Sequence, residues 1–202
     1  MRIPLRRAAP RTIVLPLALL VGAVLVAGCG TDTASASFDP ATPCAGAARQ
    51  QMKGAYPALE ARIPQEIDEK AATSRDSGRF CSTETLGSVY AAGVTEVRFG
   101  GGIWEIGDHG GVQLGAFEGD GLTPALLAEE YRLAAVKSQG TEAVRATTLE
   151  VDGHPAWRID AVNGSSRQAI VVWSSSDAAV VQVVVAADIE EAQLQAAIAA
   201  FR

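Results

Sequence analysis

Residues 154–187 read HPAWRIDAVNGSSRQAIVVWSSSDAAVVQVVVAA, and they carry the clearest strand pattern in the chain. Apolar residues alternate with polar ones between 157 and 161, which predicts a strand with one inward face. Asn163-Gly164 comes next and is a strong signal for a two-residue hairpin turn of type I′. The apolar run 178–187 is interrupted only by Gln182, so we expect a central strand covered on both faces.

The segments on either side extend this pattern. Asp188 is expected to cap a final helix whose buried stripe ends at Phe201. Residues 144–151 alternate as a further strand. Thr123-Pro124 predicts a helix that opens with a cap and a first-turn proline and runs to about Ser138. Its inner stripe is expected to contain Leu127, Tyr131, Ala134 and Ala135.

Two more alternating stretches lie upstream, at residues 94–99 and 112–117. Gly100-Gly101-Gly102 is expected to break the first of them as a bulge or bend. A phosphate-binding loop is the weaker alternative, because the run is not followed by Lys and Ser or Thr and does not open a helix. Ser82 or Thr83 is expected to cap a helix that ends at Gly93.

The start of the domain is less clearly patterned. Residues 44–62 favour two short helical pieces, because Gly54 and Pro57 would interrupt one long helix. Residues 65–79 are polar, and we expect a loop or an exposed edge strand there. Together these elements predict an α+β class, with one largely antiparallel twisted sheet and helices packed on it.

Three segments resemble the PsbP-like α+β fold. They are residues 151–157 (VDGHPAW), 170–173 (IVVW) and 180–185 (VVQVVV), the last followed by the amphipathic segment 192–201. Small actinobacterial envelope lipoproteins related to that fold look similar. Because the resemblance covers about 60 residues and contains no diagnostic catalytic motif, it implies a fold and no particular activity.

The N-terminus has the parts of a bacterial export signal. Four arginines precede the uncharged run 13–27, which at 15 residues is shorter than the roughly 20 residues that span a bilayer. Val26-Ala27-Gly28-Cys29 resembles the lipobox of bacterial lipoproteins, in which cleavage before the cysteine accompanies diacylglyceryl transfer to it. We therefore expect a signal peptide at residues 1–28 and lipidation of Cys29. A plain cleaved signal and an uncleaved anchor are the alternatives.

The remaining chain divides into a tether and a domain. Residues 29–43 are polar apart from Phe38 and predict a flexible tether, and residues 44–202 predict one globular α+β domain. Without the four arginines of the signal, 13 basic residues face 23 acidic ones, which leaves a net charge of −10. This charge argues against binding of nucleic acid or of an anionic lipid surface. Attachment to the outer face of the cell membrane is therefore expected to go through the lipid on Cys29. Arginine outnumbers lysine by 14 to 3, which suggests a GC-rich actinobacterial genome.

Two cysteines remain once Cys29 is assigned to the lipid. Cys44 and Cys81 form an even pair in an exported protein, so a disulfide bond is expected. Two unrelated buried thiols are an alternative, and a redox pair lacks the C-x-x-C spacing. We expect the bond to fasten the first helix to the start of the second.

Few residues point to chemistry. His109 and His154 are both expected in turns without ligand-spaced partners, so we expect no metal site and no cofactor. No Gly-x-Ser-x-Gly motif is present. Trp157 and Trp173 fall on inward strand positions and are expected in the core. Trp104 follows the glycine run and, with His109 nearby, is the candidate for a binding surface.

The sequence therefore predicts a non-enzymatic envelope lipoprotein that acts as a binding or accessory module. A protein or glycan of the cell envelope is the expected partner. The alternative is a secreted hydrolase of cell-wall or ester substrates in which His109 or His154 is the base. That alternative requires one histidine to lie within hydrogen-bond reach of a serine or a carboxylate.

Overall fold

The computed structural model of the protein describes residues 38–44, 49–107 and 109–201. The expected signal peptide, Cys29 and most of the expected tether lie outside these residues. The strands, in chain order, are β1 (Gln50–Met52), β2 (Glu66–Ile67), β3 (Lys70–Ala71), β4 (Ser74–Phe80), β5 (Val97–Ile106), β6 (Gly110–Glu118), β7 (Ala143–Val151), β8 (His154–Asn163), β9 (Ser166–Ser174) and β10 (Val180–Ala187). The helices are α2 (Pro57–Glu60), α3 (Thr83–Leu86), α4 (Ser88–Ala91), α5 (Pro124–Lys137) and α6 (Glu191–Ala200).

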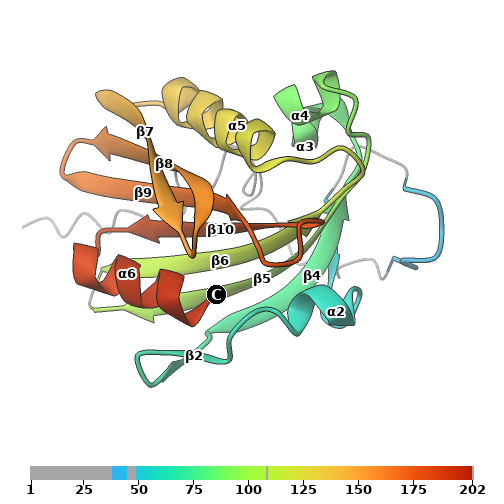
Figure 1. The fold of residues 1–202 in the computed structure, drawn as a ribbon, viewed down its shortest axis with the longest axis horizontal. Helices are drawn as coiled ribbons and strands as arrows, with labels where there is room; N and C mark the ends of the chain where they lie inside the picture. Colours follow the sequence, from blue (N-terminus) through green and yellow to red (C-terminus); the bar gives the residue numbers. More distant parts are fainter. Residues whose placement is uncertain (1–37, 45–48, 108, 202) are drawn as a thin grey trace, which may run out of the picture.

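One eight-stranded sheet dominates the described chain. Its strands pair in the order β1-β4-β5-β6-β10-β9-β8-β7, and each neighbouring pair is antiparallel. The sheet is strongly curved, and β2 and β3 form a small separate hairpin below it (Figure 1). The order shows that the two halves of the chain meet where β6 pairs with β10.

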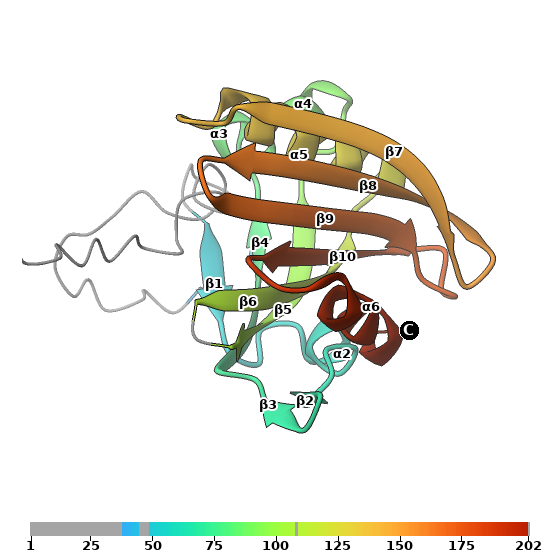
Figure 2. The ribbon, with the colours of Figure 1, turned by 90° about the vertical axis from the view of Figure 1, so that its left-hand side faces the viewer.

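Helices cover both faces of this sheet. Helices α3, α4 and α5 lie over one face, and α2 and α6 lie over the other, as Figure 2 shows from the side. Each face has its own apolar cluster. The cluster under α2 and α6 contains Trp104, Trp173 and Phe201, and the cluster under α3, α4 and α5 contains Phe80, Phe99 and Phe117.

The expected α+β class is wrong, because strands account for 43% of the structure and helices for only 23%. Segments that read as helix or loop form strands instead. Residues 50–52 are β1, and much of the polar stretch 65–79 belongs to β4, which pairs on both sides and is not an edge. Gly87 divides the helix expected after Ser82 into two pieces of four residues. The described part of the chain is one large antiparallel sheet with few helices.

The last third of the chain follows its sequence pattern most closely. The hairpin of β8 and β9 is confirmed, with Asn163 paired to Ser166. The turn residues are therefore Gly164 and Ser165, and only Gly164 has a positive φ, of 59°. That pattern fits a type II′ turn and not the expected type I′. Strand β10 is confirmed as a central, buried strand between β6 and β9.

The glycine run 100–102 does not interrupt β5, so the expected bulge or bend is wrong. Pairing with β6 continues through all three glycines. The glycines are needed for close packing: a Cβ on Gly100 would lie 2.7 Å from the carbonyl oxygen of Leu59 in α2. A Cβ on Gly102 would lie 2.7 Å from the indole ring of Trp104. The run therefore lets a helix and a large ring lie flat on the sheet.

The helix ends confirm one expected cap and correct another. Thr123 caps α5, accepting a hydrogen bond from the backbone N–H of Leu126 at 3.2 Å, and Pro124 follows in the first turn. Glu190, not Asp188, is the N-cap of α6. Asp188 instead accepts hydrogen bonds from the backbone N–H of Arg167 and the hydroxyl of Ser166. Its carboxylate holds the β10 end against the start of β9.

Candidate functional site

The predicted disulfide is confirmed. Cys44 and Cys81 are bonded, with their Cα atoms 5.7 Å apart. We expected the bond to join two helices, but Cys44 precedes the strand β1 and Cys81 directly follows β4. It fastens the start of the domain to the end of β4, next to α3.

Trp104, one of the two residues of the predicted binding surface, lies in the core. The side chain of Trp104 is 0% exposed and belongs to the core under α2 and α6, so it does not reach a partner at the surface. It is buried because Gly102 leaves room for its ring on the sheet. His109 is exposed in the turn between β5 and β6, beyond the end of the strand that carries Trp104.

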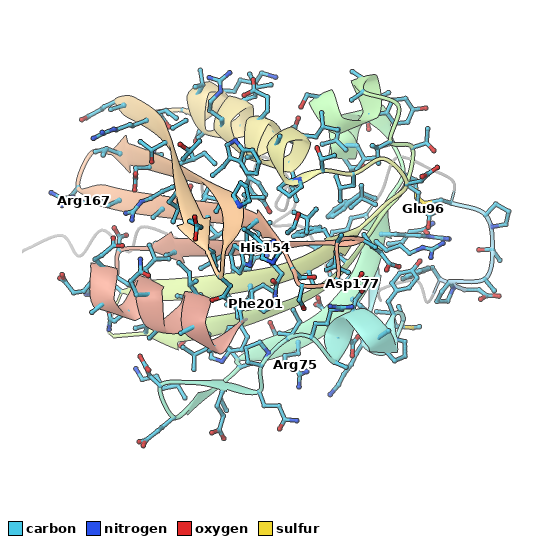
Figure 3. The ribbon with its side chains drawn as sticks, viewed as in Figure 1. Arg75, Glu96, His154, Arg167, Asp177 and Phe201 are labelled. Carbon is cyan, nitrogen blue, oxygen red and sulfur yellow. A yellow bond between two sulfur atoms is a disulfide. The ribbon has the colours of Figure 1, made fainter. Side chains whose placement is uncertain are left out.

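The two histidines belong to different parts of the sheet. His154 is half-buried at the first position of β8, where it pairs with Val151 of β7 (Figure 3). Across the described residues, neither His109 nor His154 has a hydrogen-bonded serine or carboxylate partner. The hydrolase alternative stays a prediction.

A cavity lies between the sheet and the helical roof, by which we mean α3, α4 and α5. Its volume is about 40 Å³, and its walls are mainly apolar. The side chains that line it are Phe80, Thr85, Leu86, Val89, Val97, Phe117, Leu127, Glu130 and Tyr131. They come from the strands β4, β5 and β6 and from all three helices of the roof, so the cavity depends on how the roof packs on these strands.

Local sequence determines how the helices of the roof begin and how they are connected. Ser82 caps α3 by accepting a hydrogen bond from the backbone N–H of Thr85 at 3.2 Å. Gly87 then turns the chain with a φ of 51° and ψ of −120°, a conformation that essentially only glycine adopts. Glu130 of α5 accepts hydrogen bonds from the backbone N–H and the hydroxyl of Ser88. The carboxylate thus ties α4 to α5.

Aromatic rings form the floor beside the cavity. The rings of Phe80 and Phe99 stack with centroids 5.0 Å apart, and Phe117 lies 6.3 Å beyond Phe99. The guanidinium of Arg49 lies over this layer, 4.7 Å from the centroid of Phe99 and 5.6 Å from that of Phe80. Phe80 therefore belongs both to the cavity wall and to the surface under Arg49.

Arg49 is a largely buried cation with incomplete pairing. Burial lowers the pKa of its guanidinium, and the nearby Asp76 and Tyr131 partly oppose that shift. Its Nε is buried and has no hydrogen-bond partner in the described part of the chain. Because a guanidinium stays protonated in proteins, this charge must be accommodated and not removed.

The groups around Arg49 have shifted pKa values. Burial raises the pKa of Asp76, Arg49 lowers it in part, and Glu60 raises it further. Asp76 accepts a hydrogen bond from the side-chain amide of Gln51. Burial also raises the pKa of Tyr131, against a smaller opposite effect of Arg49, so the phenol stays neutral near physiological pH.

Other buried or clustered cations donate hydrogen bonds that act in the fold, although the Nε of Arg75, like that of Arg49, has no partner in the described residues. Arg79 is 1% exposed and donates to the carbonyl oxygen of Thr42 at 2.7 Å, which fixes the segment before β1. Arg75, visible beside α2 in Figure 3, donates to the carbonyl oxygens of Glu60 and Ile63. The contacts of Arg75 hold α2 to β4, so both cations have structural roles.

The guanidinium of Arg158 also has carboxylate partners. Its guanidinium pairs with Asp160 on the same strand and with Glu191 of α6, at 2.9 and 2.8 Å. The hydrogen bonds to Glu191 raise the pKa of Arg158 and lower that of Glu191. This cluster therefore anchors α6 to β8.

No group of three or more His, Cys, Asp or Glu side chains within residues 38–44, 49–107 and 109–201 is placed to hold a metal ion. Over the same ranges, the helices are too short or too polar to cross a membrane. No protein-family model and no curated protein matches the chain. The candidate site therefore rests on the geometry of the cavity alone.

Sequence reasoning placed only part of this site. Leu127 and Tyr131 were expected on the inner stripe of α5, and they line the cavity there. Arg49 was missed, because it lay in a stretch expected to be helical and its contacts with Phe80 and Phe99 cross 31 and 50 positions of the chain. No local pattern signals such a contact.

Proposed function

We propose that this protein is a membrane-anchored extracytoplasmic lipoprotein that acts as a non-enzymatic binding module in the cell envelope, with the roofed cavity as its binding site. The disulfide between Cys44 and Cys81 fits a non-cytoplasmic protein. The lipobox at Val26–Cys29 supports anchoring through lipid on Cys29. The observation that supports binding is the apolar cavity, lined by two aromatic floor rings and by Tyr131, next to the unpaired Nε of Arg49.

A cavity of this kind favours a small ligand over a flat protein surface. Ligand sites are concave and mostly apolar, with a few polar groups that fix orientation. Here the polar groups are Thr85, Glu130 and Tyr131, against six apolar side chains. Binding of an envelope protein or a glycan stays a prediction.

Lipid anchoring is tested by changing the cysteine that would carry it. A Cys29→Ser variant should accumulate as the unprocessed precursor and lose metabolic labelling with a fatty acid. A Cys44→Ser, Cys81→Ser double variant is the matched control, because it removes both other cysteines and should keep the label. Normal processing and labelling of Cys29→Ser would refute the anchor.

Binding in the cavity is tested by filling it. Leu127 lines the cavity, whereas Leu126 is the preceding residue of the same helix and does not. A small apolar probe, benzyl alcohol, should perturb the NMR signals of cavity residues in the native protein and in Leu126→Phe. It should not do so in Leu127→Phe. Equal perturbation of both variants would place the probe elsewhere.

A further inference from the structure

We propose that the ligand of the cavity is a small amphiphile with one carboxylate, whose apolar group fills the cavity and whose carboxylate pairs with Arg49. This inference rests on the proposed function and specifies the chemistry of its ligand. The guanidinium of Arg49 is largely buried over Phe80 and Phe99, and its Nε lacks a partner in the described residues. A partly buried charge with a buried, unpaired donor is costly, and an anion would relieve that cost.

A carboxylate is the anion that fits best. Its two oxygens match the fork of donors that a guanidinium presents. The single negative charge also suits the surroundings, because Asp76 already lies near Arg49 and would repel a dianion such as phosphate. No ion pair within 4.0 Å joins Arg49 to Asp76 in the described chain, so the donor face of the guanidinium is not occupied by that carboxylate.

The cavity and the cation adjoin each other. Phe80 lines the cavity and lies under Arg49, while Tyr131 lines the cavity and is electrostatically coupled to Arg49. Arg49 does not itself line the cavity, so the ligand must extend from the cavity past Phe80 to reach the guanidinium. The neutral phenol of Tyr131 is a hydrogen-bond donor and is suited to a second contact with the carboxylate.

Charge also sets the orientation of the ligand in the cavity. Glu130 lines the cavity at the α4 side, where its carboxylate is fixed by Ser88. A ligand carboxylate is repelled there and attracted toward Arg49. The volume sets the size: a cavity of 40 Å³ holds the centres of only about three water molecules, so it suits one aromatic ring or a short branched chain and not a long acyl chain.

The test compares three probes that share one apolar group: 3-phenylpropionate, 3-phenylpropanol and 3-phenylpropylamine. Affinities are measured by isothermal titration on the full chain in lipid nanodiscs, with empty nanodiscs as the blank. The native protein should bind the acid at least about tenfold more tightly than the alcohol, and the alcohol more tightly than the amine. Arg49→Gln should reduce the affinity for the acid to that for the alcohol and leave the alcohol unchanged. Arg49→Lys should keep part of the preference.

Arg98→Gln is the matched control, since Arg98 also lies over an aromatic ring, that of Tyr56, but on the face away from the roof. It should leave all three affinities unchanged. Equal affinities for the acid and the alcohol in the native protein would overturn the carboxylate inference while leaving the proposed function intact. A preference for the acid that survives both Arg49→Gln and Leu127→Phe would overturn the site. Binding of none of the probes would count against the proposed function itself.

Discussion

Glu130 accepts two hydrogen bonds from Ser88, at 2.7 Å from the backbone N–H and 2.6 Å from the hydroxyl. The two residues are 42 positions apart, and this contact joins α4 to α5. Since both helices roof the cavity, the contact controls whether the roof stays in place. It also gives the short helix α4, which has no side-chain cap of its own, a partner for its first N–H.

Loss of this contact should loosen the roof. Glu130→Ala should lower the free energy of unfolding by about 1–3 kcal/mol, because it leaves a part-buried N–H and hydroxyl without an acceptor. Urea unfolding of Glu130→Ala, Ser88→Ala and the double variant measures the coupling between the two side chains. Glu129→Ala on the exposed side of α5 is the control and should change stability little. Strict additivity of the two substitutions would contradict the contact.

Gly87 should not tolerate a side chain. Its φ of 51° with ψ of −120° already strains an L-residue, and a Cβ there would lie 2.5 Å from Oε1 of Glu130. Gly87→Ala should therefore cost about 2–3 kcal/mol of stability. Gly54→Ala is the matched control: φ is 81°, but no atom lies within 4 Å of the added Cβ, so only the backbone cost of about 1 kcal/mol applies. The measurement is again urea unfolding, and equal losses for the two variants would show that the contact with Glu130 is not tight.

The sequence predicts those parts of the fold whose cause is local. The β8–β9 hairpin follows from alternation around Gly164, and α5 follows from Thr123 and Pro124. Strand β4 could not be predicted in the same way, because its polar residues Ser77 and Arg79 are buried. Ser77 donates a hydrogen bond to the carboxylate of Glu60 and Arg79 donates one to the carbonyl oxygen of Thr42, and both acceptors are distant in the chain. From the sequence alone, a polar segment is predicted to be exposed, because its buried hydrogen-bond partners cannot be identified.

The candidate site was hidden for the same reason. Tyr131 was placed on the correct helix face by the 3.6-residue period. The position of Arg49 depends on the pairing of β1 with β4, which brings it over rings from two strands. For Trp104 the error is the opposite one, because a residue predicted at the surface lies in the core. Its apolar ring could suit either a surface or a core, and only the neighbouring Gly102 and Ile63 make the core possible.

Removal of the disulfide should destabilise the domain strongly. The bond closes a loop with a sequence separation of 37, and the chain-entropy model gives about 4 kcal/mol for a loop of that length. Differential scanning calorimetry of the Cys44→Ser, Cys81→Ser variant should show a lowered Tm. Reductant should lower the Tm of the native protein toward the same value and leave the variant unchanged. A native Tm that is insensitive to reductant under unfolding conditions would contradict a stabilising bond.

Asp76 should make stability depend on pH in a defined direction. Its pKa in the folded state is raised by burial above the ordinary value of about 4. At a pH between the ordinary pKa and the raised pKa of the folded state, the folded protein binds more protons at Asp76 than the unfolded chain does. The Asp76 carboxyl therefore favours folding increasingly as the pH falls through this range. Asp76→Asn lacks the effect. The native free energy of unfolding should therefore rise relative to that of the variant as the pH is lowered toward 4. Urea unfolding across this range measures the difference.

Arg49 provides the control for that pH dependence. Its charge lowers the pKa of Asp76 in part, so Arg49→Gln should raise that pKa further. Two variants are then compared, Arg49→Gln and the double variant Arg49→Gln, Asp76→Asn. As the pH falls, the free energy of unfolding of Arg49→Gln should rise relative to that of the double variant. This rise should begin at a higher pH than in the native background and should be larger. Curves that stay parallel in both backgrounds would mean that Asp76 has the same proton affinity folded and unfolded. They would also remove the argument that its charge lies close enough to Arg49 to disfavour a dianionic ligand.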